Sequence, residues 1–411
     1  MNYPRELFVP SSSYQKQRNK KDHEASRMAD FLNQNIQDSS TVIDVGCGKG
    51  YVSLELADLY VKRQSENKLN IIMVDGQQNN IQSLKQEFEK REKLNGQIHT
   101  ELHTKWINLL NYKDVIPDLG QKNQITITGI HQCGNLSSLS IHEFCKNANV
   151  NQLAIIGCCY NCLTERMNYE MIKSSQIFQQ YTNSLQVDEG SGRLWDDQFV
   201  ECKLEQEINP ELVFGFPISR HVWQQMNLSQ LFLGRSVRNA ATVSLKSQKL
   251  LKNFDDTITK LFYRAAYEAI IQDKNAISTL QGEEESNSLK QKSYDCGGQV
   301  HKRRRIKKIK ELDFKEYVEQ INLVNSYQID MDKIQSEFDK NYKPLRKKFE
   351  IIYILKALLS PLTESLIVLD RLIYIQEQGY SDSKIIEIFE KQLSTRNYLI
   401  YAKKPSSKLV L

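Results

Sequence analysis

A short apolar strand that runs directly into a glycine-rich turn constrains this chain more than any other feature. Residues 41–45 are mostly apolar and β-branched, which is typical of a central strand in a parallel sheet. Three glycines follow within five residues, Gly46, Gly48 and Gly50. Glycine lets the backbone turn sharply and leaves space where a side chain would stand. The pattern therefore predicts a strand, a turn and a helix from Tyr51 that together cradle a small nucleotide-like molecule.

Two acidic residues at predicted strand ends indicate which molecule this is. Asp44 lies two residues before the first glycine, and Asp75 ends the next apolar strand, residues 70–75. The glycine spacing is one residue shorter than the dinucleotide fingerprint, and a carboxylate at that turn would repel a pyrophosphate. S-adenosylmethionine instead carries an ammonium and a sulfonium, which a carboxylate attracts.

We therefore expect S-adenosylmethionine as the cofactor, with Asp75 accepting hydrogen bonds from the ribose hydroxyls. The expected cofactor-binding residues are Asp44, Gly46, Gly48, Gly50 and Asp75. The alternative is a purely structural turn in a Rossmann-like domain that binds nothing.

Strand and helix patterns alternate along the first part of the chain and return at its end. Helices are predicted over residues 79–94 and 136–146, and further strands over 98–107, 124–130, 153–159, 384–389 and 398–402. This order predicts an α/β fold with a Rossmann-like, seven-stranded methyltransferase sheet. The last two strands should form an antiparallel hairpin that completes the sheet.

The middle of the chain has long helical stretches, notably 255–271 and 314–323. We expect three parts on this basis. Residues 1–163 form the cofactor-binding core, residues 164–350 a mostly helical insertion over the active site, and residues 351–411 a helix and hairpin that return to the core.

Composition favours a protein of the cell interior, in the cytoplasm or the nucleus. Of the 411 residues, 40% are hydrophobic, and several of the eight cysteines lie in or beside apolar runs, where free thiols act as small hydrophobes. The first fourteen residues have no apolar signal core. The most apolar run, residues 351–359, contains Lys356, so we expect no membrane-spanning segment.

The net charge of +5 is mild, but it is unevenly distributed. Residues 301–310 include eight basic side chains and follow a polar stretch, residues 281–300. This basic segment could contact RNA or serve as a nuclear-import signal, and a solvated surface segment is an equally good interpretation.

The ends of the fourth and fifth predicted strands carry the remaining chemistry. His131 and Cys133 follow the fourth strand, and Cys158, Cys159 and Cys162 follow the fifth. Ligands bind at the carboxyl ends of strands in open α/β sheets, so we take His131 and Cys133 as candidate catalytic residues. His131 could act as a base for a hydroxyl acceptor or could be a structural histidine.

A metal site is an alternative interpretation of the same segments. One histidine and three thiolates, from His131, Cys133, Cys159 and Cys162, form an acceptable zinc shell, but only the Cys-x-x-Cys half has a familiar spacing. We therefore expect no metal. His99 and His103 have the spacing of zinc-protease ligands with the glutamate misplaced, and we expect both to be structural.

Several motifs give the chain a resemblance to the methyltransferase-like protein 25 family, over about residues 18 to 403. They comprise residues 19–24, 44–50, 129–136, 157–160, 216–219, 233–239, 262–266, 369–372 and 394–397. The glycine turn is common to many methyltransferases, whereas the His-Gln-Cys-Gly and Gly-Cys-Cys-Tyr segments are more discriminating. The resemblance implies an S-adenosylmethionine-dependent methyltransferase.

The resemblance does not fix the substrate, and we expect RNA, with the acceptor group open. The family is also described as containing a ribosomal RNA adenine dimethylase domain, and such enzymes usually have an Asn/Asp-Pro-Pro-aromatic segment where this chain has residues 131–134. This difference disfavours an adenine amine. The segment is instead similar to the site of a transfer RNA ribose methylase group, which implies a hydroxyl. A protein substrate and a non-catalytic RNA-binding or assembly factor are the alternatives.

Overall fold

The computed structural model describes residues 5–11, 19–36, 41–63, 69–92, 98–104, 124–166, 214–229, 231–242, 254–272, 312–325 and 330–405. The chain divides into two compact units. One comprises Met1–Val243 with Ser360–Leu411, and the other comprises Ser244–Leu359. The expected three-part division of the chain stays a prediction.

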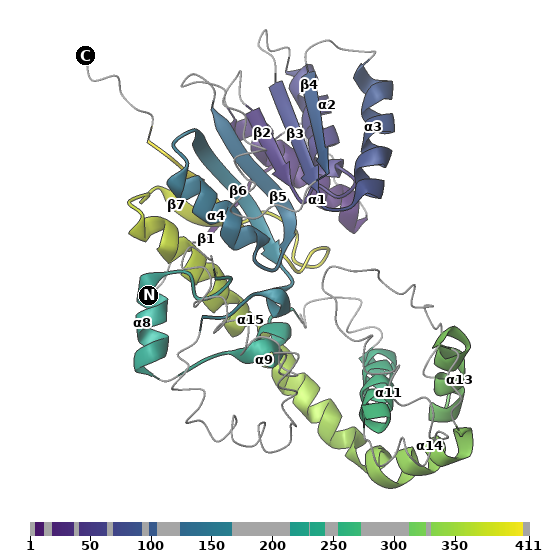
Figure 1. Ribbon diagram of the computed structural model, residues 1–411. Coiled ribbons are helices and arrows are strands. Elements are labelled where there is room, and N and C mark those ends of the chain that lie inside the picture. Colours follow the sequence, from purple (N-terminus) through teal and green to yellow (C-terminus); the bar gives the residue numbers. More distant parts are fainter. Residues whose placement is uncertain are drawn as a thin grey trace, which may run out of the picture. The chain divides into compact units, whose positions relative to one another are not determined.

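One mixed sheet organises the first unit (Figure 1), in the order β1-β7-β8-β6-β5-β2-β3-β4. Its strands are β1 (Arg5–Leu7), β2 (Thr41–Val45), β3 (Leu69–Asp75), β4 (Ile98–Thr104), β5 (Ile125–Cys133), β6 (Val150–Cys158), β7 (Ser383–Glu387) and β8 (Tyr398–Lys403). The strands β2 to β6 are parallel, and β8 is antiparallel to both β6 and β7. The predicted Rossmann-like sheet and its C-terminal hairpin are confirmed.

The short strand β1 was not predicted. It pairs with β7 at the edge of the sheet, where Arg5 lies opposite Ile385. Its three residues are too few to show a period of two, so the sequence carries no strand signal there.

Helices cover both faces of the sheet. On one face, apolar residues of α1 (Lys20–Asn35), α2 (Tyr51–Lys62) and α3 (Gln78–Glu92) pack on Val42, Ile71 and Leu399. On the other face, α4 (Leu136–Lys146) and the last turns of α15 (Arg346–Glu377) pack on Ile43, Ile155 and Ile400. Adjacent strand residues point to opposite faces, so a strand with helices on both sides is apolar throughout.

Two buried acids, Asp370 and Glu165, hold the segments that lead into α8 and α9. Asp370 accepts hydrogen bonds from the main-chain nitrogens of Ile218 and Ser219, at 2.8 and 2.9 Å, where α8 (Arg220–Leu228) begins. Glu165 accepts in the same way from Leu233 and Gly234, at the start of α9 (Gly234–Ala240). The first helical amides of α8, those of Arg220 and His221, donate to Glu377 on α15, both at 2.8 Å. A carboxylate thus satisfies the first amides of each helix, Glu377 for α8 and Glu165 for α9.

The second unit is helical and has its own core. Aromatic side chains of α11 (Phe254–Gln272), α13 (Phe314–Asn325) and the turn after α14 (Met331–Glu337) meet there. The rings of Phe314 and Phe338 stack with centroids 3.9 Å apart. The predicted helices over 255–271 and 314–323 are confirmed.

Among the described residues, one helical run, Met331–Glu377, is long and apolar enough to cross a membrane by length and composition alone. Lys356 does not interrupt this apolar helix, and the expectation of no membrane-spanning segment stays a prediction. About 33% of the apolar window is buried inside the protein, and a core helix of a soluble protein passes the same test.

Candidate functional site

The glycine turn after β2 has the geometry that the sequence predicts. Gly46, Gly48 and Gly50 have φ values of 74°, 57° and 65°, which side chains rarely tolerate. The main-chain nitrogens of Gly46 and Cys47 donate to the carbonyl of Val74, at 2.8 and 3.1 Å. These bonds tie the turn to the end of the neighbouring strand β3.

The glycines have different neighbours. A Cβ at Gly50 would lie 2.2 Å from Cδ2 of Leu84, a buried side chain of α3. A Cβ at Gly48 would meet no described atom within 4 Å. Gly50 therefore lets α3 pack against the start of α2, whereas Gly48 borders open space that a ligand can enter.

Asp44 is buried at the end of β2, with 2% of its surface exposed. The hydroxyl of Ser53, on α2, donates to Asp44 Oδ2 at 2.7 Å. Burial raises the pKa of Asp44 to about 6 and the charge of Asp75 adds to this, although the bond from Ser53 opposes it. No described cation pairs with this buried carboxylate, which therefore favours a positively charged ligand beside it.

Asp75, at the end of β3, is held by three donors. Its Oδ2 accepts from the nitrogen of Gly48 at 2.9 Å, and its Oδ1 accepts from Gln77 N and Asn80 Nδ2, at 2.8 and 3.1 Å. A carboxylate offers about four acceptor positions, so Asp75 can still take a hydrogen bond from a ribose hydroxyl. The structure thus joins both predicted acids to one turn.

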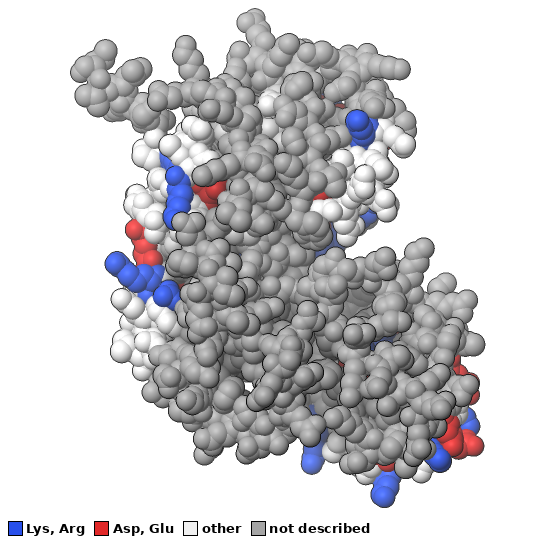
Figure 2. All heavy atoms as spheres, in the orientation of Figure 1, with Lys and Arg blue, Asp and Glu red and all other residues white. Residues whose placement is uncertain are grey.

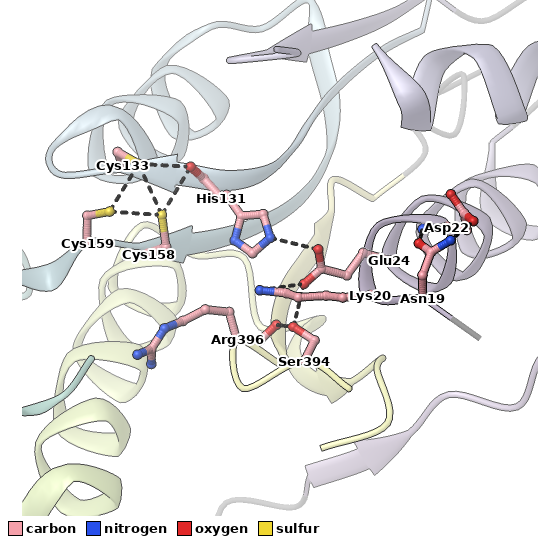
Figure 3. A network of polar contacts seen from close by, with 10 residues as sticks. All are labelled: Asn19, Lys20, Asp22, Glu24, His131, Cys133, Cys158, Cys159, Ser394 and Arg396. Atoms are coloured by element: carbon pink, nitrogen blue, oxygen red, sulfur yellow. Dashed lines mark hydrogen bonds and ion pairs between the residues drawn. The ribbon is translucent and has the colours of Figure 1, made fainter. Parts of the chain in front are cut away.

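His131 lies at the end of β5 and points toward α1 (Figure 3). Its Nε2 lies 3.0 Å from Oε2 of Glu24, whose side chain is only 5% exposed. The hydroxyl of Ser394, between β7 and β8, donates to the other carboxylate oxygen at 2.5 Å. His131 also has a φ of 59°, an uncommon backbone conformation outside glycine. Contacts from segments near both ends of the chain thus orient the imidazole.

Glu24 is built to remain charged. Burial alone would raise its pKa, but the hydrogen bond and charge of His131, followed by Ser394 and Lys20, lower the pKa below its ordinary value. A carboxylate that accepts from one ring nitrogen fixes the tautomer and leaves the other nitrogen to act on a substrate. Sequence reasoning named His131 and Cys133 as catalytic candidates but gave Glu24 no role.

Three cysteines gather beside His131 (Figure 3). The Sγ of Cys133 lies 3.1 Å from that of Cys158 and 3.2 Å from that of Cys159, and the last two are 3.4 Å apart. Hydrogen bonds from Cys133 and Cys158 lower the pKa of the Cys159 thiol to about 3, and hydrogen bonding within the cluster raises the pKa of Cys158.

The cluster differs from the four ligands weighed from the sequence. It includes Cys158, which that set left out, and the ring of His131 faces Glu24. Only Cys133, Cys158 and Cys159, among the described residues, have ligand atoms that all lie within 4.8 Å of one another. His131 and Cys162 do not belong to this group.

Two loops are fastened together next to this cluster. The Asn135 side chain donates to Thr164 Oγ1 at 2.8 Å and accepts from Thr164 N at 2.9 Å. Gly134 has a φ of 54°, and a Cβ there would lie 2.8 Å from the carbonyl oxygen of Cys162. The ends of β5 and β6 are therefore held in one arrangement.

Two predictions fall on residues without a full description. The basic segment, residues 301–310, lies outside the described residues. His99 and His103 lie on β4, as expected for a strand, but their side chains are not among those described.

Comparison with known proteins decides what kind of domain surrounds this turn. A family model described as "Methyltransferase domain" matches residues 20–166, from the start of α1 to just beyond β6. Residues 20–166 are thus similar to methyltransferase domains.

The chain is also similar to two curated proteins named "Probable methyltransferase-like protein 25". It is 26% identical to the Mus musculus protein over 301 residues, and 25% identical to the Homo sapiens protein over 292 residues. The matches cover 72% and 71% of this chain but only 40% and 38% of those proteins. The resemblance to this family is confirmed, and the chain spans less than half the length of these relatives.

Solved structures with partial similarity include an S-adenosylmethionine-dependent methyltransferase from Aquifex aeolicus. The two chains are 20% identical, the match covers 34% of this chain and 70% of that one, and the TM-score is 0.23.

Proposed function

We propose that this chain is an S-adenosylmethionine-dependent methyltransferase. The observation that carries the proposal is the pair of carboxylates, Asp44 and Asp75, at adjacent strand ends around a turn that is open at Gly48. The methyltransferase domain matched over residues 20–166 supports it.

The residues present fit this cofactor. Asp44 is a buried acid without a cationic partner among the described residues, which suits the positively charged methionine part. Asp75 keeps acceptor capacity for ribose, and Gly48 leaves space for the ligand. The cofactor supplies an electrophilic methyl group on sulfur.

His131 and Glu24 provide the groups that an oxygen acceptor needs. With S-adenosylmethionine bound, a hydroxyl acceptor would take the methyl group in place of its proton, and the cofactor would leave as the neutral thioether. His131 accepts that proton, and the carboxylate of Glu24 stabilises the imidazolium that results. Such a base contributes typically about 10²–10⁴-fold to the rate.

RNA is the acceptor that we favour, because residues 131–134 lack the segment that holds an adenine amine and are similar to a ribose methylase site. Figure 2 shows basic and acidic side chains of the described residues mixed on the drawn face. This face therefore gives no support for RNA binding, and the preference for RNA depends on the sequence alone. A protein acceptor is the second candidate, and a location inside the cell is part of the proposal.

A transfer assay tests the activity. The full chain is incubated with methyl-labelled S-adenosylmethionine and with total RNA or total protein from cells that lack the gene. Label in RNA that disappears on ribonuclease treatment is the expected result. Label in protein would overturn the RNA assignment, and a chain that binds the cofactor but labels neither fraction would point to the non-catalytic alternative.

Two variants test the roles of His131 and Glu24. His131→Ala should bind the cofactor with unchanged affinity but transfer methyl about 10²–10⁴-fold more slowly. Glu24→Gln retains a polar partner without the charge, and we expect an intermediate loss of kcat. Equal transfer rates in His131→Ala and the unaltered chain would remove His131 from the mechanism.

A further inference from the structure

The three-cysteine cluster is a site that methyl transfer from sulfur does not require. Cys133 ends β5, Cys158 ends β6 directly opposite it in the sheet, and Cys159 follows with a φ of 48°. Parallel pairing therefore places Cys133 beside Cys158, and the unusual backbone at Cys159 turns a third thiol toward them. Cys133 and Cys159 are accessible, whereas Cys158 is buried.

The spacing of the sulfur atoms suits a shared metal ion. The three Sγ–Sγ distances are 3.1, 3.2 and 3.4 Å. Zinc bonds to thiolate at about 2.3 Å, so sulfurs around one tetrahedral ion lie roughly 3.8 Å apart. Each thiol therefore has to move outward by only a few tenths of an ångström to receive the ion.

The buried guanidinium of Arg371 lies next to the cluster, and its positive charge favours a negatively charged group beside it. Arg371, on α15, is 0% exposed, and none of its guanidinium nitrogens has a hydrogen-bond partner among the described residues. The guanidinium lies against Gly157, since a Cβ there would be 2.2 Å from Arg371 Nη1. Burial lowers the pKa of Arg371, whereas the charges of Tyr160, Asp370 and Cys158 raise it.

Charge balance favours a metal centre over three neutral thiols. The guanidinium lies 5.5 Å from the ring centroid of Tyr160, but no described anion hydrogen-bonds it, so the desolvation of its charge is only partly offset. A divalent ion with three thiolates carries one net negative charge, which would be placed beside Gly157 and the guanidinium. Soft thiolate ligands select zinc, copper(I) or iron–sulfur clusters, and a group of three cysteines around one point suits a single zinc ion.

We propose that Cys133, Cys158 and Cys159 bind one zinc ion, with the fourth coordination position left to solvent or another exchangeable ligand. Each thiol gives up its proton to water as its sulfur bonds to the ion. The thiol hydrogen bonds of Cys133 and Cys158, to the carbonyl of His131 and among the sulfurs, are lost in this step. Three protein ligands and an open position are typical of reactive zinc sites.

Metal analysis of the purified full chain tests the proposal without any assay of methyl transfer. Mass spectrometry should find zinc in a one-to-one ratio with the chain. Cobalt(II) exchanged into the site should show sulfur-to-cobalt charge-transfer absorption. Cys133→Ser and Cys159→Ser should each weaken zinc binding by more than about 100-fold, which exceeds the 10–100-fold effect typical of outer partners.

Matched controls are available in the same domain. Cys145→Ser changes a half-buried thiol on α4 outside the cluster and should leave the zinc content unchanged. Cys162→Ser should also keep zinc, and loss of the metal in that variant would overturn the open fourth position. Circular dichroism of each variant separates metal loss from unfolding.

Three results would overturn the zinc site itself. These are an absence of stoichiometric metal, iron in place of zinc, and equal zinc content in Cys133→Ser, Cys159→Ser and the unaltered chain.

Discussion

Asp44 couples the protonation of one buried carboxyl to the affinity for the proposed cofactor. The raised pKa of about 6 means that this group is half neutral at mildly acidic pH. A neutral carboxyl no longer attracts an ammonium or a sulfonium. We therefore predict that S-adenosylmethionine affinity falls as the pH drops through about 6, approaching tenfold per pH unit below it.

Stability should respond to Asp44 in the opposite direction. Its folded pKa is raised above its ordinary value of 3.8, so protonation favours the folded state. The contribution of Asp44 to stability is full below pH 3.8 and is lost as the pH rises through about 6. Calorimetric titrations on either side of pH 6 thus separate lost affinity from acid unfolding. Asp44→Asn should bind weakly without this pH dependence, and a pH-independent affinity in the unaltered chain would contradict the assignment.

Gly48 and Gly50 form a matched pair, because both have positive φ but only Gly50 faces a packed neighbour among the described residues. An alanine should cost about 1–2 kcal/mol at either position for the backbone alone. We predict that Gly50→Ala costs about 1–3 kcal/mol more, because its Cβ would collide with Leu84. Gly48→Ala should instead lose cofactor affinity. Denaturant unfolding and calorimetry together test both statements, and equal unfolding free energies would contradict the first.

At this scale, the residues that sequence reasoning found are those with local signals. The acids and glycines of the turn lie beside recognisable strands. Glu24 and Ser394 were not assigned roles, since Glu24 contacts His131 across 107 sequence positions and Ser394 across 370. The family resemblance included residues 19–24 and 394–397, and it was the only sign in the sequence that Glu24 and Ser394 act together.

Among the elements, strands with a clear apolar pattern were predicted to within about three residues at either end, and α4 matches residues 136–146. Helix α1 was missed because its buried face includes polar residues, His23, Glu24 and Asp30, which hide the helical period. Its start did carry a signal, since Asn19 accepts from the nitrogen of Asp22 at 3.0 Å, as a helix cap does.

The strand β8 connects β7, and β1 beyond it, to the rest of the sheet. Its Leu399 and Ile400 are almost fully buried and contribute roughly 3–6 kcal/mol together. A chain that ends after Gln392 also loses Ser394, and the sheet edge of β6 becomes unpaired. We predict that this truncated chain loses its cooperative thermal transition.

A chain that ends after Pro405 is the control, because it keeps every described residue. It should unfold at the same temperature as the full chain. A cooperative transition and full cofactor affinity in the shorter truncation would show that β8 is dispensable.

For the whole molecule, the sequence predicted a helical middle region but could not predict which helices share a core. Packing of α11 on α13 depends on aromatic contacts between segments, such as Tyr263 on Phe314 with centroids 5.5 Å apart. Helical periodicity shows that a helix has an apolar face, and it does not show which partner covers that face. The helix α15 belongs to both units, which no local pattern in its sequence indicates.

The most direct test of the account is calorimetric titration of S-adenosylmethionine into the full chain at neutral pH, with Asp44→Asn in parallel. We predict saturable binding at a single site in the unaltered chain and a loss of at least about tenfold in the variant, which corresponds to about 1.4 kcal/mol. The variant should remain folded, because asparagine can still accept from Ser53. An absence of binding in the unaltered chain, or equal affinity in both proteins, would contradict the assignment of this turn as a methyl-donor site.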